Sequence, residues 1–222
     1  MIYSHLWELI NSSEDSKAKY NLLMRWAVLA RKFPDGSADD TDTRNYNSLE
    51  SLYKWLDNSG FYTAPASTQY HESYIGGLCD HTLKVVDNII TLSKLPVFSS
   101  VDLASAILVA LVHDWCKIGF YTSYDKNVKD ATGNWVKTQA FKYSGSPMIA
   151  LGHGAASMYL ASKWFNLSDE EALAIRWHMG AWRIVDSECN ELQYANENYP
   201  LVHMLQFADQ LSITKYFTPN NL

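Results

Sequence analysis

Apolar residues recur every three or four positions along most of this chain, the spacing that places side chains on one face of an α-helix. Stretches with this spacing cover residues 22–30, 49–56, 77–95, 102–113, 153–165, 168–178 and 200–216. The sequence contains no internal repeat and no low-complexity tract. The pattern therefore predicts an all-α fold in which several amphipathic helices pack together as a bundle.

Polar and helix-breaking residues predict where several of these helices begin and end. Ser168 and Glu171 have the spacing of a capping box, in which each side chain accepts a hydrogen bond from the other residue's backbone N–H. Pro96 should stop the helix that starts near residue 77, and Asp102 is expected in the first turn of the next helix. Pro200 suits the first turn of the last helix.

Residues 120–148 break the helical spacing. The turn-forming residues 130–134 separate two segments, 124–128 and 135–141, so we expect a β-hairpin or a long loop inserted between helices. Several aromatic residues lie in this insertion: Tyr121, Tyr124, Trp135, Phe141 and Tyr143. Their rings can either stack on a nucleotide base or pack the hairpin against the helices, and the sequence favours neither.

Composition limits the classes of protein that this chain can belong to. Apolar residues make up 47% of its 222 residues, enough to form a packed core. The net charge of −6 argues against binding to long nucleic acid, although a metal ion could still hold a small phosphorylated substrate. The longest apolar run, residues 104–112, is too short for a membrane span.

Three cysteines lie far apart and form no C-x-x-C motif: Cys79, Cys116 and Cys189. This arrangement gives no disulfide framework and favours the reducing cytoplasm. The first residues have no basic stretch followed by an apolar core, so no signal peptide is expected. Oligomeric state stays open, with the Trp-rich helices of residues 1–65 as a candidate interface of a homo-oligomer.

Histidine and aspartate residues occur at positions that suggest a metal site. The set consists of His81, His113, Asp114, His153, His178 and Asp209. Adjacent side chains on a helix diverge by about 100°, so His113 and Asp114 can face one ion only where the helix turns or ends. A mixed set of imidazole and carboxylate ligands suits Fe, Mn, Co, Ni or Zn.

The order of these residues resembles the HD-domain superfamily of metal-dependent phosphohydrolases. The segment 76–82, Gly-Gly-Leu-Cys-Asp-His-Thr, looks like the G-G-L-x-x-H-T motif of HD domains found in 3′→5′ exoribonucleases. The segment 111–117, Leu-Val-His-Asp-Trp-Cys-Lys, is similar to the family's L-x-H-D-x-x-K. The resemblance covers about residues 70–216. It implies an HD-type helical domain over residues 66–222, with residues 1–65 as a helical segment packed on it.

The resemblance also implies roles for single residues. His81, His113, Asp114 and Asp209 match the ligands of a first divalent ion. His153 and His178 match the pair that holds a second ion in some members, with Asp114 bridging the two. Lys117 matches a basic residue that contacts phosphate, and we expect Arg176 near it. The implied reaction is in-line attack of metal-activated water on phosphorus, with Asp114 and Lys117 as catalytic residues.

These features predict an enzyme that cleaves a phosphate ester or anhydride of a small nucleotide. Two alternatives within the enzyme class are a 3′→5′ exonuclease and a cyclic-nucleotide phosphodiesterase. A third alternative is a regulatory module that binds metal and nucleotide without turnover, because ligands alone do not prove catalysis. Nucleotide-acting relatives with a similar hairpin carry charged residues after Gly-His-Gly, whereas this chain has Ala155 and Ala156.

Overall fold

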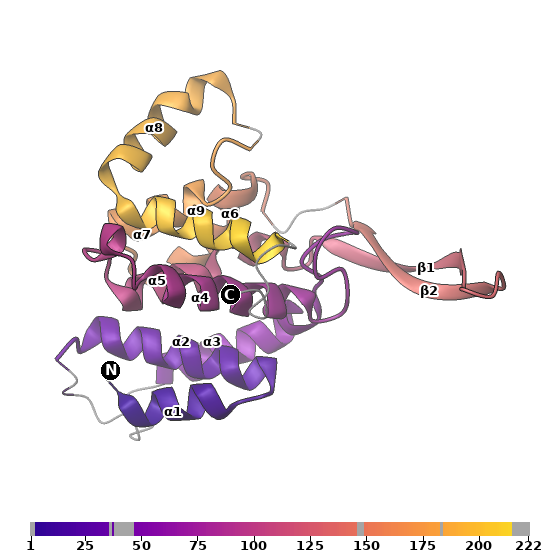
Figure 1. The fold of residues 1–222 in the computed structure, drawn as a ribbon, viewed down its shortest axis with the longest axis horizontal. Helices are drawn as coiled ribbons and strands as arrows, with labels where there is room; N and C mark the ends of the chain where they lie inside the picture. Colours follow the sequence, from indigo (N-terminus) through magenta and orange to yellow (C-terminus); the bar gives the residue numbers. More distant parts are fainter. Residues whose placement is uncertain (1–2, 36, 38–46, 146–148, 183, 215–222) are drawn as a thin grey trace.

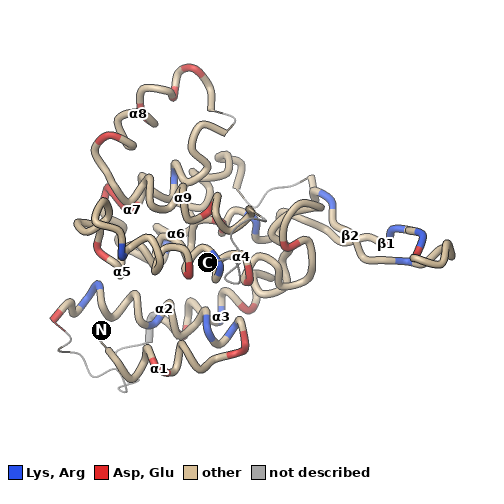
Figure 2. Tube along the Cα trace, in the orientation of Figure 1, with Lys and Arg blue, Asp and Glu red and all other residues tan. Residues whose placement is uncertain are grey.

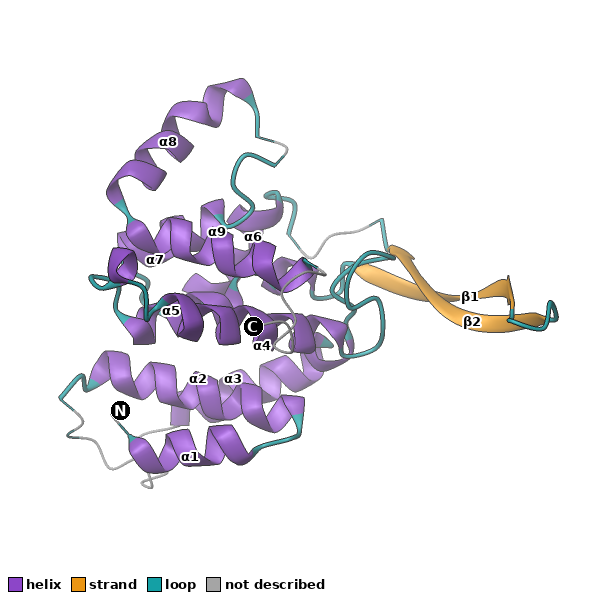
Figure 3. Ribbon diagram, viewed as in Figure 1, coloured by secondary structure: helices purple, strands orange, loops and turns teal. Residues whose placement is uncertain are grey.

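The computed structural model describes residues 3–35, 37, 47–145, 149–182 and 184–214. These residues form nine α-helices and one antiparallel hairpin (Figures 1 and 3). The helices are α1 (Ser4–Ser12), α2 (Ser16–Lys32), α3 (Asn47–Ser59), α4 (Gly77–Leu92), α5 (Leu103–Val112), α6 (His153–Ser162), α7 (Asp169–Trp177), α8 (Cys189–Asn198) and α9 (Pro200–Ile213). The strands are β1 (Tyr121–Lys129) and β2 (Trp135–Tyr143). The predicted helical fold with an inserted hairpin is confirmed at this level.

Helix α5 forms the centre of the bundle. Eight of its ten residues are buried, from Ala104 to Val112 with the exception of Ser105. It packs against α2 on one side and against α4, α7 and α9 on others, as a helix that is apolar all round must do (Figure 1). Asp102 precedes the helix as its N-cap, accepting a hydrogen bond from the backbone N–H of Ser105 at 2.7 Å. The sequence predicted Asp102 inside the first turn, whereas the structure has it one position earlier, as the N-cap.

The predicted helix boundaries agree with the structure to within a few residues. The capping box of Ser168 and Glu171 is present at the start of α7. Helix α4 ends at Leu92, three residues earlier than predicted, because a short 3-10 turn begins at Pro96 and the chain must bend before it. The last helix ends at Ile213, and the expected continuation to 216 falls outside the described residues. Helices α1 and α8 were not predicted.

The hairpin projects away from the helices (Figure 1). Its strands pair from Tyr121 opposite Tyr143 to Lys129 opposite Trp135, and most of their residues are exposed. Only Phe141, near the root, is buried. Figure 2 shows acidic and basic residues interspersed along the helices, with several basic residues on the hairpin.

The N-terminal helices share one core with the rest of the chain. The ring of Tyr20 on α2 is fully buried, and its hydroxyl donates to the backbone carbonyl of Leu111 at 2.8 Å. That same hydroxyl accepts a hydrogen bond from the indole Nε1 of Trp115 at 3.1 Å. The ring of Trp55 packs against Trp115, with centroids 5.1 Å apart. Trp55 of the N-terminal segment and Trp115 therefore pack together within the chain.

Among the described residues, no helix combines the length and the apolar character needed to cross a lipid bilayer. The three cysteines are free thiols, with Cys79 buried and Cys189 exposed.

Candidate metal centre

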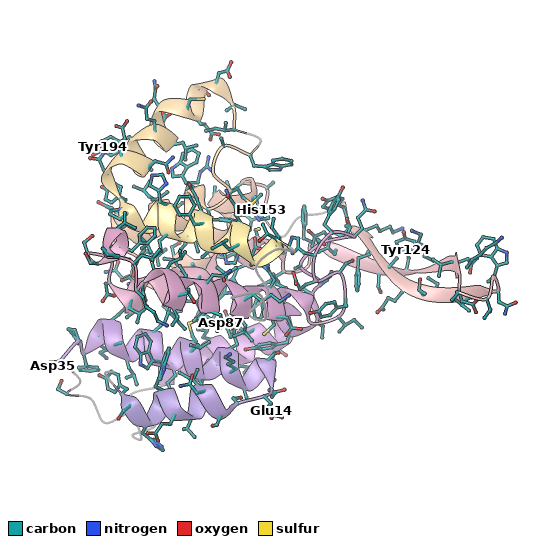
Figure 4. All side chains as sticks on the ribbon, viewed as in Figure 1. Glu14, Asp35, Asp87, Tyr124, His153 and Tyr194 are labelled. Atoms are coloured by element: carbon teal, nitrogen blue, oxygen red, sulfur yellow. The ribbon has the colours of Figure 1, made fainter. Side chains whose placement is uncertain are left out.

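Five helices bring the six predicted ligands into one buried cluster. His81 lies in the first turns of α4, His113 directly follows α5, and Asp114 comes next. His153 is the first residue of α6, His178 directly follows α7, and Asp209 lies on α9. In Figure 4, the labelled His153 lies near the middle of the molecule, on the side from which the hairpin projects. The sequence therefore predicted which side chains meet here.

Asp114 is at the centre of the cluster. Its Oδ2 lies 3.3 Å from Nε2 of His81 and 3.3 Å from Nε2 of His113. Its Oδ1 lies 2.7 Å from Nε2 of His153 and 3.6 Å from Nε2 of His178. The two oxygens thus divide the four imidazoles into two pairs. Asp209 adds its Oδ1 to the first pair, at 3.2 Å from His81 and 3.9 Å from His113.

The backbone explains how two adjacent residues reach the same point. His113 keeps helical dihedral angles (φ −56°, ψ −32°), but Asp114 leaves the helix (φ −110°, ψ 17°). A 3-10 turn over Trp115–Lys117 then redirects the chain. The structure agrees with the expectation that this pair can converge only where its helix ends.

Two of the histidines are fixed by the same local device at the end of a helix. The Nδ1–H of His113 donates to the carbonyl of Ala110 at 2.7 Å, and that of His178 donates to the carbonyl of Ile175 at 2.8 Å. A carbonyl can only accept, so both imidazoles carry hydrogen on Nδ1 in their neutral form. Each Nε2 therefore presents a lone pair to the centre of the cluster.

The Nε2 atoms of three histidines lie close to carboxylate oxygens in the cluster. Nε2 of His81, of His113 and of His178 are buried and have no hydrogen-bond partner among the described residues. Each lies 3.2 to 3.6 Å from a carboxylate oxygen of Asp114 or Asp209. Buried acceptors that face one another without a donor are costly, whereas a cation between them satisfies every one. The donor set and its geometry therefore fit one or two divalent ions.

Lys117 contributes the one ammonium found within hydrogen-bond distance of Asp114 among the described residues. Its Nζ lies 2.6 Å from Oδ2 of Asp114, and the side chain is buried. Burial alone would lower the pKa of Lys117, but the negative charge of Asp114 raises it above the usual value. Burial opposes ionisation of Asp114 too, yet the positive charge of Lys117 holds the pKa of its carboxyl well below the usual range. Both groups therefore remain charged near neutral pH.

Three residues beside the cluster were missed by the sequence analysis: His71, Glu72 and Ser212. The ring of His71 lies 4.9 Å from that of His81. Ser212 Oγ lies 3.2 Å from His81 Nδ1, and Glu72 Oε2 lies 3.9 Å from the same atom. The sequence does contain a trace of the close approach of Glu72, namely the glycine at position 77. A Cβ on Gly77 would lie 1.9 Å from the carbonyl oxygen of Glu72, so glycine is needed there.

Arg176 contacts Glu188 and Trp177 in this structure. Its guanidinium forms an ion pair with Glu188 at 2.5 Å and lies over the ring of Trp177, 4.0 Å from the centroid. The side chain is two residues from His178 on α7, and such neighbours diverge on a helix. Glu188 and Trp177 hold the guanidinium, so the expected substrate contact is not part of the site described here.

A hollow of about 360 Å³ lies at the root of the hairpin. Its walls include Thr63, Ile75, Tyr121, Gln139 and Phe141. Burial raises the pKa of Tyr121 to about 12, and Lys117 and Asp114 are close enough to act on that pKa. Tyr121 is therefore a half-buried wall residue of the hollow whose hydroxyl stays un-ionised near neutral pH.

Comparisons with protein-family models, with curated proteins and with solved structures give no match to this chain. The chain's own residues, and their resemblance to the HD-domain pattern, therefore carry the functional assignment.

Proposed function

We propose that this protein is a metal-dependent phosphohydrolase that cleaves a phosphate ester or anhydride of a small nucleotide. The observation that carries the proposal is the convergence of three unpartnered Nε2 atoms on Asp114 and Asp209. The order of the ligands along the chain, which resembles that of HD-domain phosphohydrolases, supports the same reading.

Two sets of ligands share the bridging carboxylate of Asp114. His81, His113, Asp114 and Asp209 would hold one ion, and Asp114, His153 and His178 would hold a second. Groups from both sets have ligand atoms close enough together for one ion. Mixed imidazole and carboxylate ligands suit Fe, Mn, Co, Ni or Zn.

When bound, a divalent ion in such a site lowers the pKa of coordinated water towards about 7 and neutralises phosphoryl oxygens. The protein's own groups supply the remaining functions. The buried ammonium of Lys117 stabilises negative charge that develops on the phosphoryl group. The carbonyls of Ala110 and Ile175 hold two imidazoles in the tautomer and orientation needed for ligation.

Charge and shape favour a small substrate over a long one. The chain has a net charge of −6, and its basic residues are interspersed with acidic ones along the helices (Figure 2). Binding of long RNA or DNA depends on basic residues that follow the phosphate backbone. The hollow at the hairpin root has a size suited to part of a small molecule rather than to a polymer.

The test combines elemental analysis of the purified protein with phosphate release from a panel of nucleotides in the presence of Mn²⁺. The panel includes cyclic nucleotides and short oligonucleotides, so that phosphodiesterase and exonuclease activities are also measured. We expect bound metal and release from at least one mononucleotide. Binding of nucleotide without any release would favour the regulatory module instead.

Asp114→Asn is the variant that tests the site itself. Removal of a residue that merely orients a ligand typically costs about 10–100-fold in metal affinity or activity, so loss of a bridging ligand should cost at least about 100-fold. Asp125→Asn on the exposed hairpin makes the same chemical change away from the cluster and should have no effect. Full metal content and full activity in Asp114→Asn would refute the proposal.

A further inference from the structure

The two ring nitrogens of His81 face different surroundings. Nε2 points into the cluster, 3.3 Å from Asp114 and 3.2 Å from Asp209. Nδ1 lies 3.2 Å from the hydroxyl oxygen of Ser212 and 3.9 Å from Oε2 of Glu72. The residue is 1% exposed, so these neighbours, rather than bulk water, determine which nitrogen carries the hydrogen.

The hydroxyl of Ser212 has a single hydrogen, and another contact already uses it. Ser212 Oγ donates to the backbone carbonyl of Asp209 at 2.6 Å. Towards His81, the same oxygen is therefore left with its lone pairs and acts as an acceptor. An accepting oxygen at 3.2 Å requires hydrogen on Nδ1 of His81, which leaves a lone pair on Nε2.

Glu72 reinforces this arrangement from the other side. Its Oε1 forms an ion pair with Lys84, and its Oε2 lies 3.0 Å from Nδ1 of His71. Its backbone has a positive φ of 38° and is packed so closely against Gly77 that a Cβ there would not fit. The carboxylate is therefore held in place on the Nδ1 side of His81, whereas Nε2, although close to Asp114 and Asp209, has no hydrogen-bond partner among the described residues.

We propose that Ser212 and Glu72 are positioning residues that fix His81 in its Nδ1–H tautomer and so prepare Nε2 to bind the metal. His81 then follows the same rule as His113 and His178, with a hydroxyl and a carboxylate in place of a backbone carbonyl. The last turn of α9 has two roles, because Asp209 supplies a ligand and Ser212, three residues on, orients another. The effect on metal affinity depends on the function proposed above, but the tautomer does not.

The tautomer is tested directly by ¹⁵N-resolved NMR of the histidine rings in metal-free protein. The pH is set alkaline enough to keep the imidazoles neutral, since a protonated ring carries both hydrogens. We expect hydrogen on Nδ1 of His81 in the unaltered protein, and a mixture of both tautomers in Ser212→Ala. Hydrogen on Nε2 of His81 in the unaltered protein would overturn the inference.

Metal affinity is tested by titration calorimetry with Mn²⁺. Ser212→Ala should weaken binding by about 10–100-fold, the usual effect of removing a group that orients a ligand. Ser212→Thr retains the hydroxyl and should restore most of the affinity. Thr214→Ala is the matched control, because Thr214 also donates to a carbonyl three residues earlier, that of Leu211, but lies at the exposed end of the helix.

The two measurements separate failure of the inference from failure of the proposed function. Absence of Mn²⁺ binding in the unaltered protein contradicts the function, while its NMR spectrum still decides the tautomer. Equal affinity of the unaltered protein and Ser212→Ala contradicts the positioning role. Should Ser212→Ala fail to fold, Glu72→Gln and the spectrum of the unaltered protein remain decisive, with weaker binding expected for Glu72→Gln and unchanged binding counting against it.

Discussion

At the scale of single residues, the cluster depends on how one carboxylate and one ammonium share a buried space. Asp114 faces four imidazoles and the Nζ of Lys117, and all of these groups except His153 are less than one-tenth exposed. Divalent ions bound by the imidazoles would compete with Lys117 for Asp114. Lys117 would then be the cation free to meet an incoming phosphoryl group.

Lys117→Met should therefore separate metal binding from turnover. Loss of one preorganised charge-stabilising group typically costs about 100-fold or more in kcat, and the methionine retains most of the apolar volume. We expect such a fall in the rate of phosphate release with unchanged metal stoichiometry, measured by elemental analysis. Lys137→Met, on the exposed part of the hairpin, is the control. Unimpaired turnover in Lys117→Met would remove Lys117 from the catalytic role.

Sequence reasoning succeeded for residues with a local signal. The His113–Asp114 pair at the end of an apolar helix indicated a buried ligand pair, since a core has little use for an unpaired carboxylate. Ser212 gave no such signal, because its contact with His81 forms only when α4 and α9 pack together. The ion pair of Arg176 with Glu188 could not be predicted, because Glu188 lies on a segment that had no predicted structure.

At the scale of elements, a close contact between α6 and α7 sets the position of His153. A Cβ on Gly154 would lie 2.0 Å from the backbone carbonyl oxygen of Arg176, so the two helices can approach only with glycine there. Gly152, just before α6, has φ 78° and ψ 168°, a conformation found essentially only at glycine. The backbone structure thus requires glycine on both sides of His153.

Gly154→Ala should separate these helices and move His153 away from Asp114. Overpacking of this kind costs about 1–3 kcal/mol of stability, because the obstructing atom belongs to the backbone. The measurement is urea denaturation, together with Mn²⁺ stoichiometry. Ser162→Ala, at the exposed far end of α6, should leave both unchanged. Wild-type stability in Gly154→Ala would show that the helices can shift freely.

The hairpin root offers a second element-scale prediction, about the substrate. Tyr121 lines the hollow at the hairpin root, and stacking of a base on an aromatic ring contributes about 1–3 kcal/mol. Tyr121→Ala should lower kcat/KM for a nucleoside monophosphate by about tenfold or more and leave that for ribose 5-phosphate unchanged. Tyr124→Ala, further along β1, is the matched control. Equal losses with both substrates would mean that the hollow does not hold the base.

The elements that the sequence predicted are those with a strong apolar stripe or clear turn residues. Helix α8 was missed because only Leu192 and Ala195 of its ten residues are buried, too few to establish a period. Helix α1 has the same weakness, with Leu6 and Ile10 as its buried residues. The sequence could not decide between a hairpin and a long loop for residues 120–148. Both faces of the two strands are exposed, so their residues show no alternation of apolar and polar side chains.

At the scale of the whole molecule, the candidate ligands span residues 81 to 209 and come from five helices. No part of the unfolded chain brings them together, so divalent ions should bind the folded state preferentially. Binding of this kind stabilises a protein by about 2.7 kcal/mol when the free ion exceeds its Kd a hundredfold.

Chelation should therefore lower the melting temperature. For a chain of 222 residues, 1 kcal/mol corresponds to about 2–4 °C, so EDTA should lower Tm by about 5–10 °C. Addition of excess Mn²⁺ should reverse the change, as followed by differential scanning calorimetry. Asp114→Asn should show no response to EDTA. A Tm that is unaffected by EDTA and Mn²⁺ in the unaltered protein would argue against a metal held in the fold.

Tyr20 lies far from every ligand in the sequence, yet its hydroxyl joins the end of α5 to Trp115, on either side of His113 and Asp114. Helix α2 thus helps to hold the turn that carries His113 and Asp114, although it supplies none of the candidate ligands. For the proposed phosphohydrolase, substitution of Tyr20 would therefore register as loss of turnover in a genetic selection, although no ligand is altered.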